Sequence, residues 1–320
     1  MIEHGFTVEY TIESMLMTDS PESIATAMGL TVIKFADFWK LHSGEFDVVF
    51  CLGDRYEMFS AVSAAIPFNI KFAHIHGGET TLGAIDNIFR HSITLASKLH
   101  FVSADAHADR VAEITQSRDG VYNVGALSLD NLSQLKLLSI QEFKEKWGID
   151  LTKQTILTTF HPETIDLDAN AGNTSNLVAA IKSLPQYQFL ITMPNADTAG
   201  NMIRSALIEE LSEQENIFLI ENLGSQSYFT ALKYVSFLLG NTSSGIIEAA
   251  SFGKYVLNLG NRQLGRTSGE NVIHVPIETQ EILKAVRSLE KKPLGESRNI
   301  YDNGGAAVII VDVLKNLIKK

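Results

Sequence analysis

The sequence predicts an α/β protein made of two Rossmann-like, doubly wound domains that face each other across a cleft. Two observations favour this fold class: short apolar or β-branched runs alternate with helical-period segments, and polar clusters recur directly after the runs. Strands that alternate with helices are typical of βαβ units and a parallel sheet, whose ligands bind at the carboxyl ends of the strands. The length of 320 residues allows two domains of ordinary size.

Each predicted strand is a short run flanked by polar residues or glycine. The run at 46–52 (FDVVFCL) is continuously apolar, as expected of a buried parallel strand. Further strands are predicted at 6–12, 72–75, 99–102, 155–159, 189–193, 217–220, 237–240 and 255–259. Helices are predicted at 56–66, 85–97, 105–115, 175–183, 201–213, 226–234, 246–251 and 308–318.

The regular alternation of predicted strands and helices pauses at residues 130–153, where neither pattern is clear. We interpret this pause as the transition between an N-terminal domain over residues 1–150 and a C-terminal domain over 151–300, followed by a terminal helical segment over 301–320. A doubly wound domain normally starts with a strand, a ligand-binding turn and a helix, a unit that needs roughly 30 or more residues. No such unit precedes the predicted strand at 6–12. We therefore expect the N-terminal domain to lack its first βα unit.

Composition excludes several classes of protein. A formal net charge of −11 disfavours a general nucleic-acid binder. No apolar stretch is long enough to span a bilayer, and the N-terminus has neither the basic nor the apolar region of a signal peptide. Cys51 is the single cysteine, which fits a reducing cytosol. These features predict a cytoplasmic protein with no membrane partner.

A turn after the predicted strand at 237–240 combines glycines with small polar residues. It reads Gly240, Asn241, Thr242, Ser243, Ser244 and Gly245. Backbone N–H groups and the positive end of the following helix dipole would face one point there, which suits a phosphate. The alternative is an ordinary Ser/Thr N-cap. Glu248, about one turn further, can accept hydrogen bonds from ribose hydroxyls or compensate the helix dipole.

Two polar clusters follow strands of the predicted N-terminal domain. Asp54 and Arg55 come directly after strand 46–52. At a strand end they suit a proton acceptor and an anion binder. The alternative is that Asp54 is a helix N-cap beside a solvated Arg55. Glu79 follows strand 72–75 through a Gly-Gly turn, and Asp86 and Arg90 share one helix face at i, i+4 spacing. Two carboxylates with an arginine suit acid–base chemistry, whereas the alternative for the Asp86–Arg90 pair is a surface salt bridge.

The predicted C-terminal domain adds candidates after its own strands. His161 follows strand 155–159 and can act as an acid, a base or a phosphate donor, although a lone loop histidine is more often structural. Asn195 follows strand 189–193 together with Asp197. Arg262 and Arg266 can clamp an anion or form a solvated basic turn.

A metal site is not predicted. His74 and His76 alternate along the predicted strand at 72–75 and just beyond it, so their side chains face opposite sides. The sequence also has no HExxH or CxxC pattern.

Taken together, the motifs resemble the hydrolysing UDP-N-acetylglucosamine 2-epimerases. The matching segments are 53–55 (GDR), 74–94 (HIHGGETTLGAIDNIFRHSIT), 160–164 (FHPET), 192–197 (TMPNAD) and 240–275 (GNTSSGIIEAASFGKYVLNLGNRQLGRTSGENVIHV). They occur in order and at the family's spacing over nearly the whole chain; non-hydrolysing 2-epimerases and GT-B glycosyltransferases are looser relatives. The resemblance implies a GT-B-like fold, a diphosphate in the interdomain cleft and a terminal helix packed back on the N-terminal domain.

The resemblance also implies a reaction. A base removes the C2 proton while UDP leaves C1, which gives a 2-acetamidoglucal. Water then adds to C1 as C2 is protonated from the other face, which yields UDP and N-acetylmannosamine. This chemistry needs carboxylates on both sides of the sugar and cationic donors on the leaving diphosphate.

Roles follow from position in the family's motifs. The implied catalytic residues are Asp54, Glu79, Asp86, Arg90 and His161. The implied UDP-binding residues are Arg55, His161, Asn195, Thr242, Ser243, Glu248 and Arg262, with Ser244 and Gly245 of the same turn. We favour Asp54 and Glu79 for proton transfer, with Asp86 orienting Arg90.

The resemblance leads us to expect no cofactor, no metal, a UDP-amino sugar as partner and a homodimer or homotetramer. Three alternatives stay open. The same chemistry can act on a UDP-2,4-diacetamido-trideoxyhexose. The family's first strand and its turn, with an arginine that reaches the substrate, are not found in this sequence, so a non-catalytic UDP-sugar binding protein is a second alternative. A retaining glycosyltransferase is a third, disfavoured because the block at 79–90 resembles the epimerases.

Overall fold

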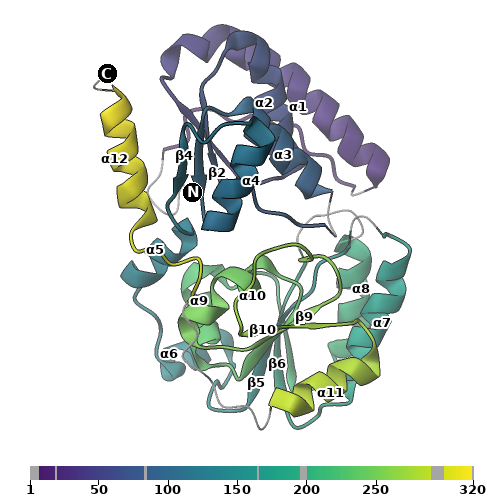
Figure 1. The fold of residues 1–320 in the computed structure, drawn as a ribbon. Helices are drawn as coiled ribbons and strands as arrows, with labels where there is room; N and C mark the ends of the chain where they lie inside the picture. Colours follow the sequence, from purple (N-terminus) through teal and green to yellow (C-terminus); the bar gives the residue numbers. More distant parts are fainter. Residues whose placement is uncertain are drawn as a thin grey trace.

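The chain forms two β-sheets of parallel strands, one in each lobe of the molecule (Figure 1). The computed structural model describes residues 7–18, 20–82, 85–163, 166–194, 200–289 and 299–318. The N-terminal sheet has the order β1-β2-β3-β4, with β1 (Val49–Leu52), β2 (Phe72–Ile75), β3 (Leu99–Val102) and β4 (Val121–Asn123). The C-terminal sheet has the order β10-β9-β8-β5-β6-β7, with β5 (Thr155–Thr159), β6 (Gln188–Thr192), β7 (Ile217–Ile220), β8 (Phe237–Gly240), β9 (Val256–Leu259) and β10 (Val272–Val275).

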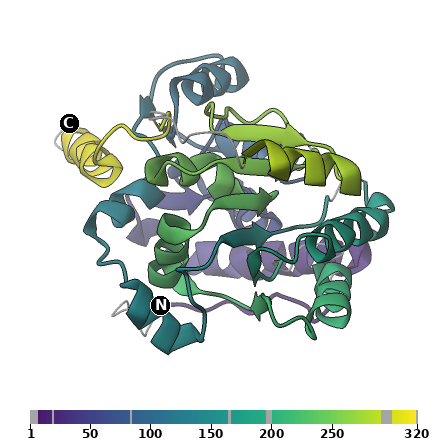
Figure 2. The same ribbon diagram turned by 90° about the horizontal axis from the view of Figure 1, so that it is seen from below.

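Helices separate the strands and cover the sheets (Figures 1 and 2). In the first half of the chain they are α1 (Pro21–His42), α2 (Tyr56–Ala65), α3 (Asp86–Ala96), α4 (Asp105–Thr115), α5 (Leu127–Gln134) and α6 (Ile140–Trp147). In the second half they are α7 (Ala169–Lys182), α8 (Gly200–Leu211), α9 (Gly224–Tyr234), α10 (Ser243–Ile247), α11 (Thr279–Leu289) and α12 (Ala306–Ile318). None of the described helices is long and apolar enough to cross a bilayer.

The C-terminal sheet is buried on both faces, as a parallel sheet between helices must be. Side chains alternate along β5: Ile156 packs into a core with Leu177 of α7 and Ile282 of α11, whereas Leu157 packs into a second core with Phe229 of α9. Neighbouring residues of one strand thus serve two hydrophobic layers, which explains the nearly continuous apolar runs in the sequence.

The N-terminal sheet lies between α1–α3 on one face and α12 on the other. Phe72 of β2 packs with Trp39 of α1, while its neighbour Ala73 packs with Ala306 and Ile310 of α12. The last helix of the chain therefore supplies a face of the first sheet, and Figure 1 shows it alongside that lobe. The domain boundaries near residues 150 and 300 stay predictions.

Several elements differ from those predicted. The strand expected at 6–12 is wrong for its described residues 7–12, which make no sheet hydrogen bonds, because an extended segment forms a strand only beside a partner. Helix α1 was not predicted, although Ser20 caps it and Pro21 opens it. Strands β4 and β10 and helices α5, α6 and α11 were not predicted either, and α6 lies inside the expected pause at 130–153. The expected helix at 246–251 begins earlier, at Ser243, and gives way to a 3₁₀ turn at Ala249.

The order of the C-terminal sheet reverses at β5. Chain order runs outward from β5 to β6 and β7 on one side, and β8, β9 and β10 lie on the other. A crevice opens where the connections leave in opposite directions, and ligands of such sheets bind there. Within the described residues this switch point is at the carboxyl ends of β5 and β8, two residues before His161 and one before Asn241.

Candidate active site

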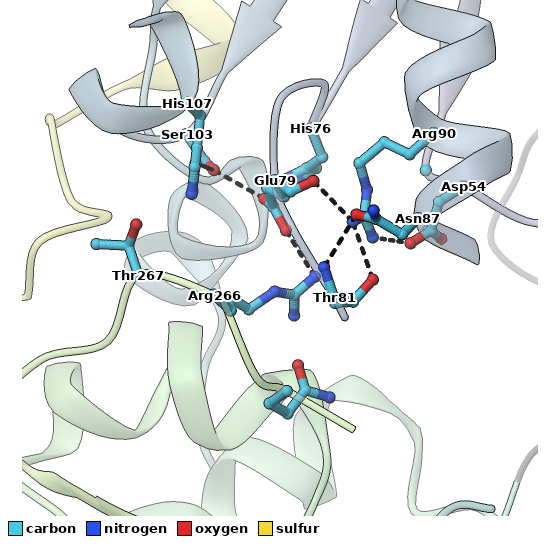
Figure 3. Close-up of polar contacts among 12 residues, drawn as sticks. Asp54, His76, Glu79, Thr81, Asn87, Arg90, Ser103, His107, Arg266 and Thr267 are labelled. Atoms are coloured by element: carbon cyan, nitrogen blue, oxygen red, sulfur yellow. Dashed lines mark hydrogen bonds and ion pairs between the residues drawn. The ribbon is translucent and has the colours of Figure 1, made fainter. Parts of the chain in front are cut away.

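Glu79 is the centre of a buried polar cluster between the two sheets (Figure 3). It follows β2 and is 1% exposed. Its Oε1 lies 2.8 Å from Nδ1 of His76 and accepts a hydrogen bond of 2.8 Å from the Ser103 hydroxyl. Its Oε2 lies 2.6 Å from Nη2 of Arg266, which comes from the loop between β9 and β10. Both carboxylate oxygens are therefore held, one of them by a residue of the other lobe.

The surroundings of Glu79 decide its charge. Burial raises the pKa of this carboxyl, but Arg266 and His76 act more strongly together and hold the pKa well below its usual range. Behind Ser103, burial lowers the pKa of His107 to about 4, so this imidazole is neutral at pH 7. The cluster is thus built to keep Glu79 ionised.

Asp54 and Arg90 form a second ion pair beside Glu79. Arg90 of α3 bonds to the Asp54 carboxylate, and its Nη1 donates to the backbone oxygen of Glu79 at 3.0 Å and to Thr81 Oγ1 at 3.1 Å. Arg90 is 2% exposed, so the expectation of a surface salt bridge at this arginine is wrong. The alternative of Asp54 as a helix N-cap is also wrong, because the N-cap residue of α2 is Arg55.

Three guanidinium groups act on one another electrostatically here. Burial lowers the pKa of Arg90, and the charges of Arg266 and Arg262 lower it further, which puts all three within electrostatic reach. In the described part of the chain, neither Nε nor Nη1 of Arg266 has a hydrogen-bond partner, although both are buried. Buried donors of this kind suit an anionic ligand.

His161 and Asn241 lie at the switch point of the C-terminal sheet. The backbone N–H of His161 donates to Asn241 Oδ1 at 2.7 Å, and Asn241 Nδ2 donates to the backbone oxygen of His161 at 2.9 Å. Gly240 must be glycine here, since its φ is 148° and a Cβ would lie 2.1 Å from the backbone oxygen of Thr159.

The turn after β8 caps a short helix. The side chain of Thr242 accepts a hydrogen bond from the backbone N–H of Ser244, as in the N-cap alternative. Because α10 has only five residues, its dipole is a weaker attraction for a phosphate than the sequence suggested. Gly245 is needed for packing, since a Cβ there would lie 2.8 Å from Val256.

A cavity of about 650 Å³ opens beside this turn. Its lining includes His161, Met193, Asn222, Ser243, Ser244 and Glu248, from loops that follow β5, β6, β7 and β8. Glu248 accepts a 2.5 Å hydrogen bond from Ser128 of α5. Burial raises the pKa of Glu248, while hydrogen bonds from Ser128 and Ser244 and the charges of His76 and Arg266 oppose the rise.

The other predicted residues are placed less centrally. The guanidinium of Arg55 forms an ion pair with Glu57 and lies over the Tyr56 ring. Asp86 begins α3, and its pairing with Arg90 stays a prediction. Asn195 and Asp197 lie outside the described residues.

Sequence reasoning missed the roles of His76 and Ser103 in the site and gave Arg266 and Asn241 only part of theirs. His76 lies just past the end of β2 in the left-handed conformation, with φ 64°, which turns its ring toward Glu79. Ser103 follows β3, at the strand end where ligand residues gather, and this position was a usable signal. Arg266 was considered only as an anion clamp, and Asn241 only as part of a turn.

The described residues contain no group of three or more His, Cys, Asp or Glu side chains that could hold a metal ion. His74 is buried between Thr94 and the backbone oxygen of Gly53, away from His76.

Two α/β lobes, each with a parallel sheet, and a polar site between them define a GT-B-like fold. This fold is the architecture of nucleotide-sugar enzymes. The family described as UDP-N-acetylglucosamine 2-epimerase matches residues 1–315, and the chain belongs to this family of enzymes.

Individual relatives agree with this membership. The chain is 34% identical to polysialic acid biosynthesis protein P7 of Escherichia coli over 99% of its own length and 81% of that protein. It is 33% identical to the hydrolysing UDP-N,N'-diacetylbacillosamine 2-epimerase of Legionella pneumophila, over 92% of this chain and 77% of that one. A crystal structure of UDP-GlcNAc 2-epimerase from Neisseria meningitidis bound to UDP-GlcNAc has a TM-score of 0.79 at 21% identity, over 94% and 84% of the chains, and so shares the fold.

Proposed function

We propose that the chain is a hydrolysing 2-epimerase that converts UDP-N-acetylglucosamine to UDP and N-acetylmannosamine. The observation that carries the proposal is the arginine cluster between the sheets. Arg266 binds Glu79 and keeps two further donors, and Arg90 binds Asp54, so the candidate carboxylates and the candidate diphosphate donors form one site. The relatives named as 2-epimerases support the reaction class.

The cavity beside the turn after β8 suits the nucleotide part of the substrate. It is large enough for a ligand of that size, and polar groups from four loops line it. We assign Glu248 to the ribose and Thr242, Ser243 and His161 to the diphosphate, with Arg262 and Arg266 as the charged donors. The sugar ring then extends toward Asp54 and Glu79.

The reaction needs a proton acceptor at C2 and stabilisation of the departing diphosphate. Glu79 is ionised because Arg266 and His76 lower its pKa. A lowered pKa makes this carboxylate a weak base, so we assign it as the proton acceptor from its charge and its place in the site, not from its basicity. The electron pair of the C2–H bond forms the C1=C2 double bond as the C1–O bond to UDP breaks. The guanidinium groups take up the charge that develops on the diphosphate. Water then adds to C1; Asp54, assigned to the other face, takes a proton from this water and delivers it to C2, and Glu79 releases the proton from the first step to solvent.

A second substrate is favoured by a specific observation. The Legionella relative is named for UDP-N,N'-diacetylbacillosamine, a UDP-2,4-diacetamido-trideoxyhexose, and is 33% identical to this chain. The two sugars differ at C4 and C6, far from the C2 chemistry, so the same catalytic groups serve both.

The test is turnover in deuterated water with each UDP-sugar in turn. We expect UDP release with one deuterium at C2 of the sugar product. UDP release without deuterium at C2 would refute epimerisation, and UDP binding without any turnover would favour a binding protein. The better of the two substrates, by kcat/KM, identifies the sugar.

A further inference from the structure

His161 lies where the parallel strands β5 and β8 end and their connections leave in opposite directions. The last paired residues of β5 and β8 are Thr159 and Gly240. Among the described residues the β5–β8 register ends at this pair, and His161 lies two residues after Thr159, beyond it. Some other group must fix the backbone at the point where the imidazole meets the cavity.

Asn241 supplies that group. Its backbone N–H donates to the oxygen of Thr159 at 3.1 Å, and its side chain bonds both polar groups of the His161 backbone, at 2.7 and 2.9 Å. The side-chain amide thus acts as one more rung of the ladder, across the switch point. Asn241 is completely buried, so water cannot replace these bonds.

Asn241 is itself held by the arginine loop. The side chain of Gln263 donates to the backbone oxygen of Asn241 at 2.8 Å, and Gln263 is 1% exposed. Gln263 follows Arg262 directly, and Thr242 follows Asn241. One asparagine therefore joins the histidine, the turn after β8 and the arginine loop.

We infer that Asn241 is a positioning residue that holds the His161 imidazole at the cavity through the two hydrogen bonds to the His161 backbone. The inference rests on the proposed function, in which His161 contacts the diphosphate. Asn241 touches no substrate in this assignment and acts only through the residues that do.

A double-mutant cycle tests this inference. UDP dissociation constants are measured by calorimetry for His161→Ala, Asn241→Ala and the double variant. We expect each single change to weaken UDP binding about tenfold and the double change to weaken it no more than either one, because neighbours that act as a unit are not additive. An additive effect of about a hundredfold would overturn the inference.

The chain offers a matched control in Asn258. This asparagine lies on β9 in register with Gly240, is 1% exposed, and its Nδ2 is 3.1 Å from Nδ1 of His274, outside the site. Asn258→Ala removes an equally buried amide one strand away. We expect UDP affinity within about twofold of the unchanged protein, by the additivity of independent sites. A loss equal to that of Asn241→Ala would mean that only general packing is at stake, and would overturn the inference.

A measurement without ligand separates this inference from the proposed function. The His161 imidazole resonance is assigned by its disappearance in His161→Ala. In the free protein we expect Asn241→Ala, or Asn241→Asp if the alanine variant does not fold, to move this resonance and Asn258→Ala to leave it. An unmoved resonance would overturn the positioning role. A chain that fails to bind UDP would refute the proposed function and leave this readout intact.

Discussion

Arg266 and Glu79 form a buried ion pair across the two lobes, with Nη2 of the arginine 2.6 Å from Oε2 of the carboxylate. Their side chains are 7% and 2% exposed. Arg266 comes from the loop after β9 and Glu79 from the loop after β2, so this ion pair connects the two lobes. Because the carboxylate also binds His76 and Ser103, removal of the arginine leaves a charge that is buried but only partly compensated.

Arg266→Gln should therefore destabilise the protein in a pH-dependent way. The folded-state pKa of Glu79 is depressed, so the stability from this pair is fully present above the unfolded pKa, near the ordinary value for glutamate, and is lost as pH falls toward the folded pKa. We expect a loss of about 3 kcal/mol in the free energy of unfolding at pH 7, as for other broken buried pairs, and a smaller loss at pH 4. Urea unfolding at both pH values measures this. Equal losses at both would contradict the assigned cause.

Glu79→Gln should abolish turnover while UDP binding is spared. The amide keeps the size of the side chain but cannot accept the C2 proton, and general base catalysis contributes roughly 10²–10⁴-fold. We expect kcat to fall by at least about 10²-fold with a UDP dissociation constant close to that of the unchanged protein. Ser103→Ala is the comparison, because it removes one hydrogen bond to Glu79 and keeps the carboxylate, and should cost far less. Normal turnover of Glu79→Gln would remove this residue from the mechanism.

The strands of this fold were the most predictable part. Buried parallel strands such as β2, β3 and β5 are short apolar or β-branched runs, and their limits follow from the polar residues or glycines near each end. Helix α1 was missed although Ser20 and Pro21 mark its start, because only three of its residues are buried and its apolar pattern is weak. Residues 7–12 look like a strand, but the pattern cannot say whether a partner lies beside them.

The candidate site was predictable as a set of positions and not as a set of contacts. Its residues lie at strand ends, a rule that follows from topology. Which partner each charge takes depends on how the chain folds: spacing could suggest Asp86 as a partner of Arg90, but it could not suggest Asp54, which the structure brings to this arginine from 36 residues away. His76 reaches Glu79 only because the backbone turns left-handed after β2, which no periodicity records.

Arg262→Ala should weaken UDP binding. Its charge acts on Arg90, so it lies within electrostatic reach of the cluster assigned to the diphosphate. A charge-assisted hydrogen bond contributes about 1.5–3 kcal/mol, which corresponds to roughly 10–100-fold in the dissociation constant. Calorimetry with UDP measures the change. Arg118→Ala is the control, since Arg118 is 67% exposed and pairs with Asp109 on α4. An unchanged constant for Arg262→Ala would contradict its assignment.

Asp130→Ala should loosen α12 from the N-terminal sheet. The Asp130 carboxylate, on α5, accepts hydrogen bonds from the backbone N–H groups of Ala306 at 2.9 Å and Ala307 at 2.6 Å, which open α12. Loss of such a cap costs about 1 kcal/mol. Because Ala306 and Ile310 pack on Ala73 of β2, the loss should reach the sheet itself.

Hydrogen exchange followed by peptide mapping can locate this loss. We expect faster exchange in α12 and in β2 and β3 of the Asp130→Ala variant, with β5 and β6 unchanged, if the terminal segment folds as part of the N-terminal domain, as we propose. Asp130→Asn, which keeps an acceptor oxygen, should restore most of the protection. Faster exchange in α12 alone would separate the helix from that domain, because a shared folding unit must open as one.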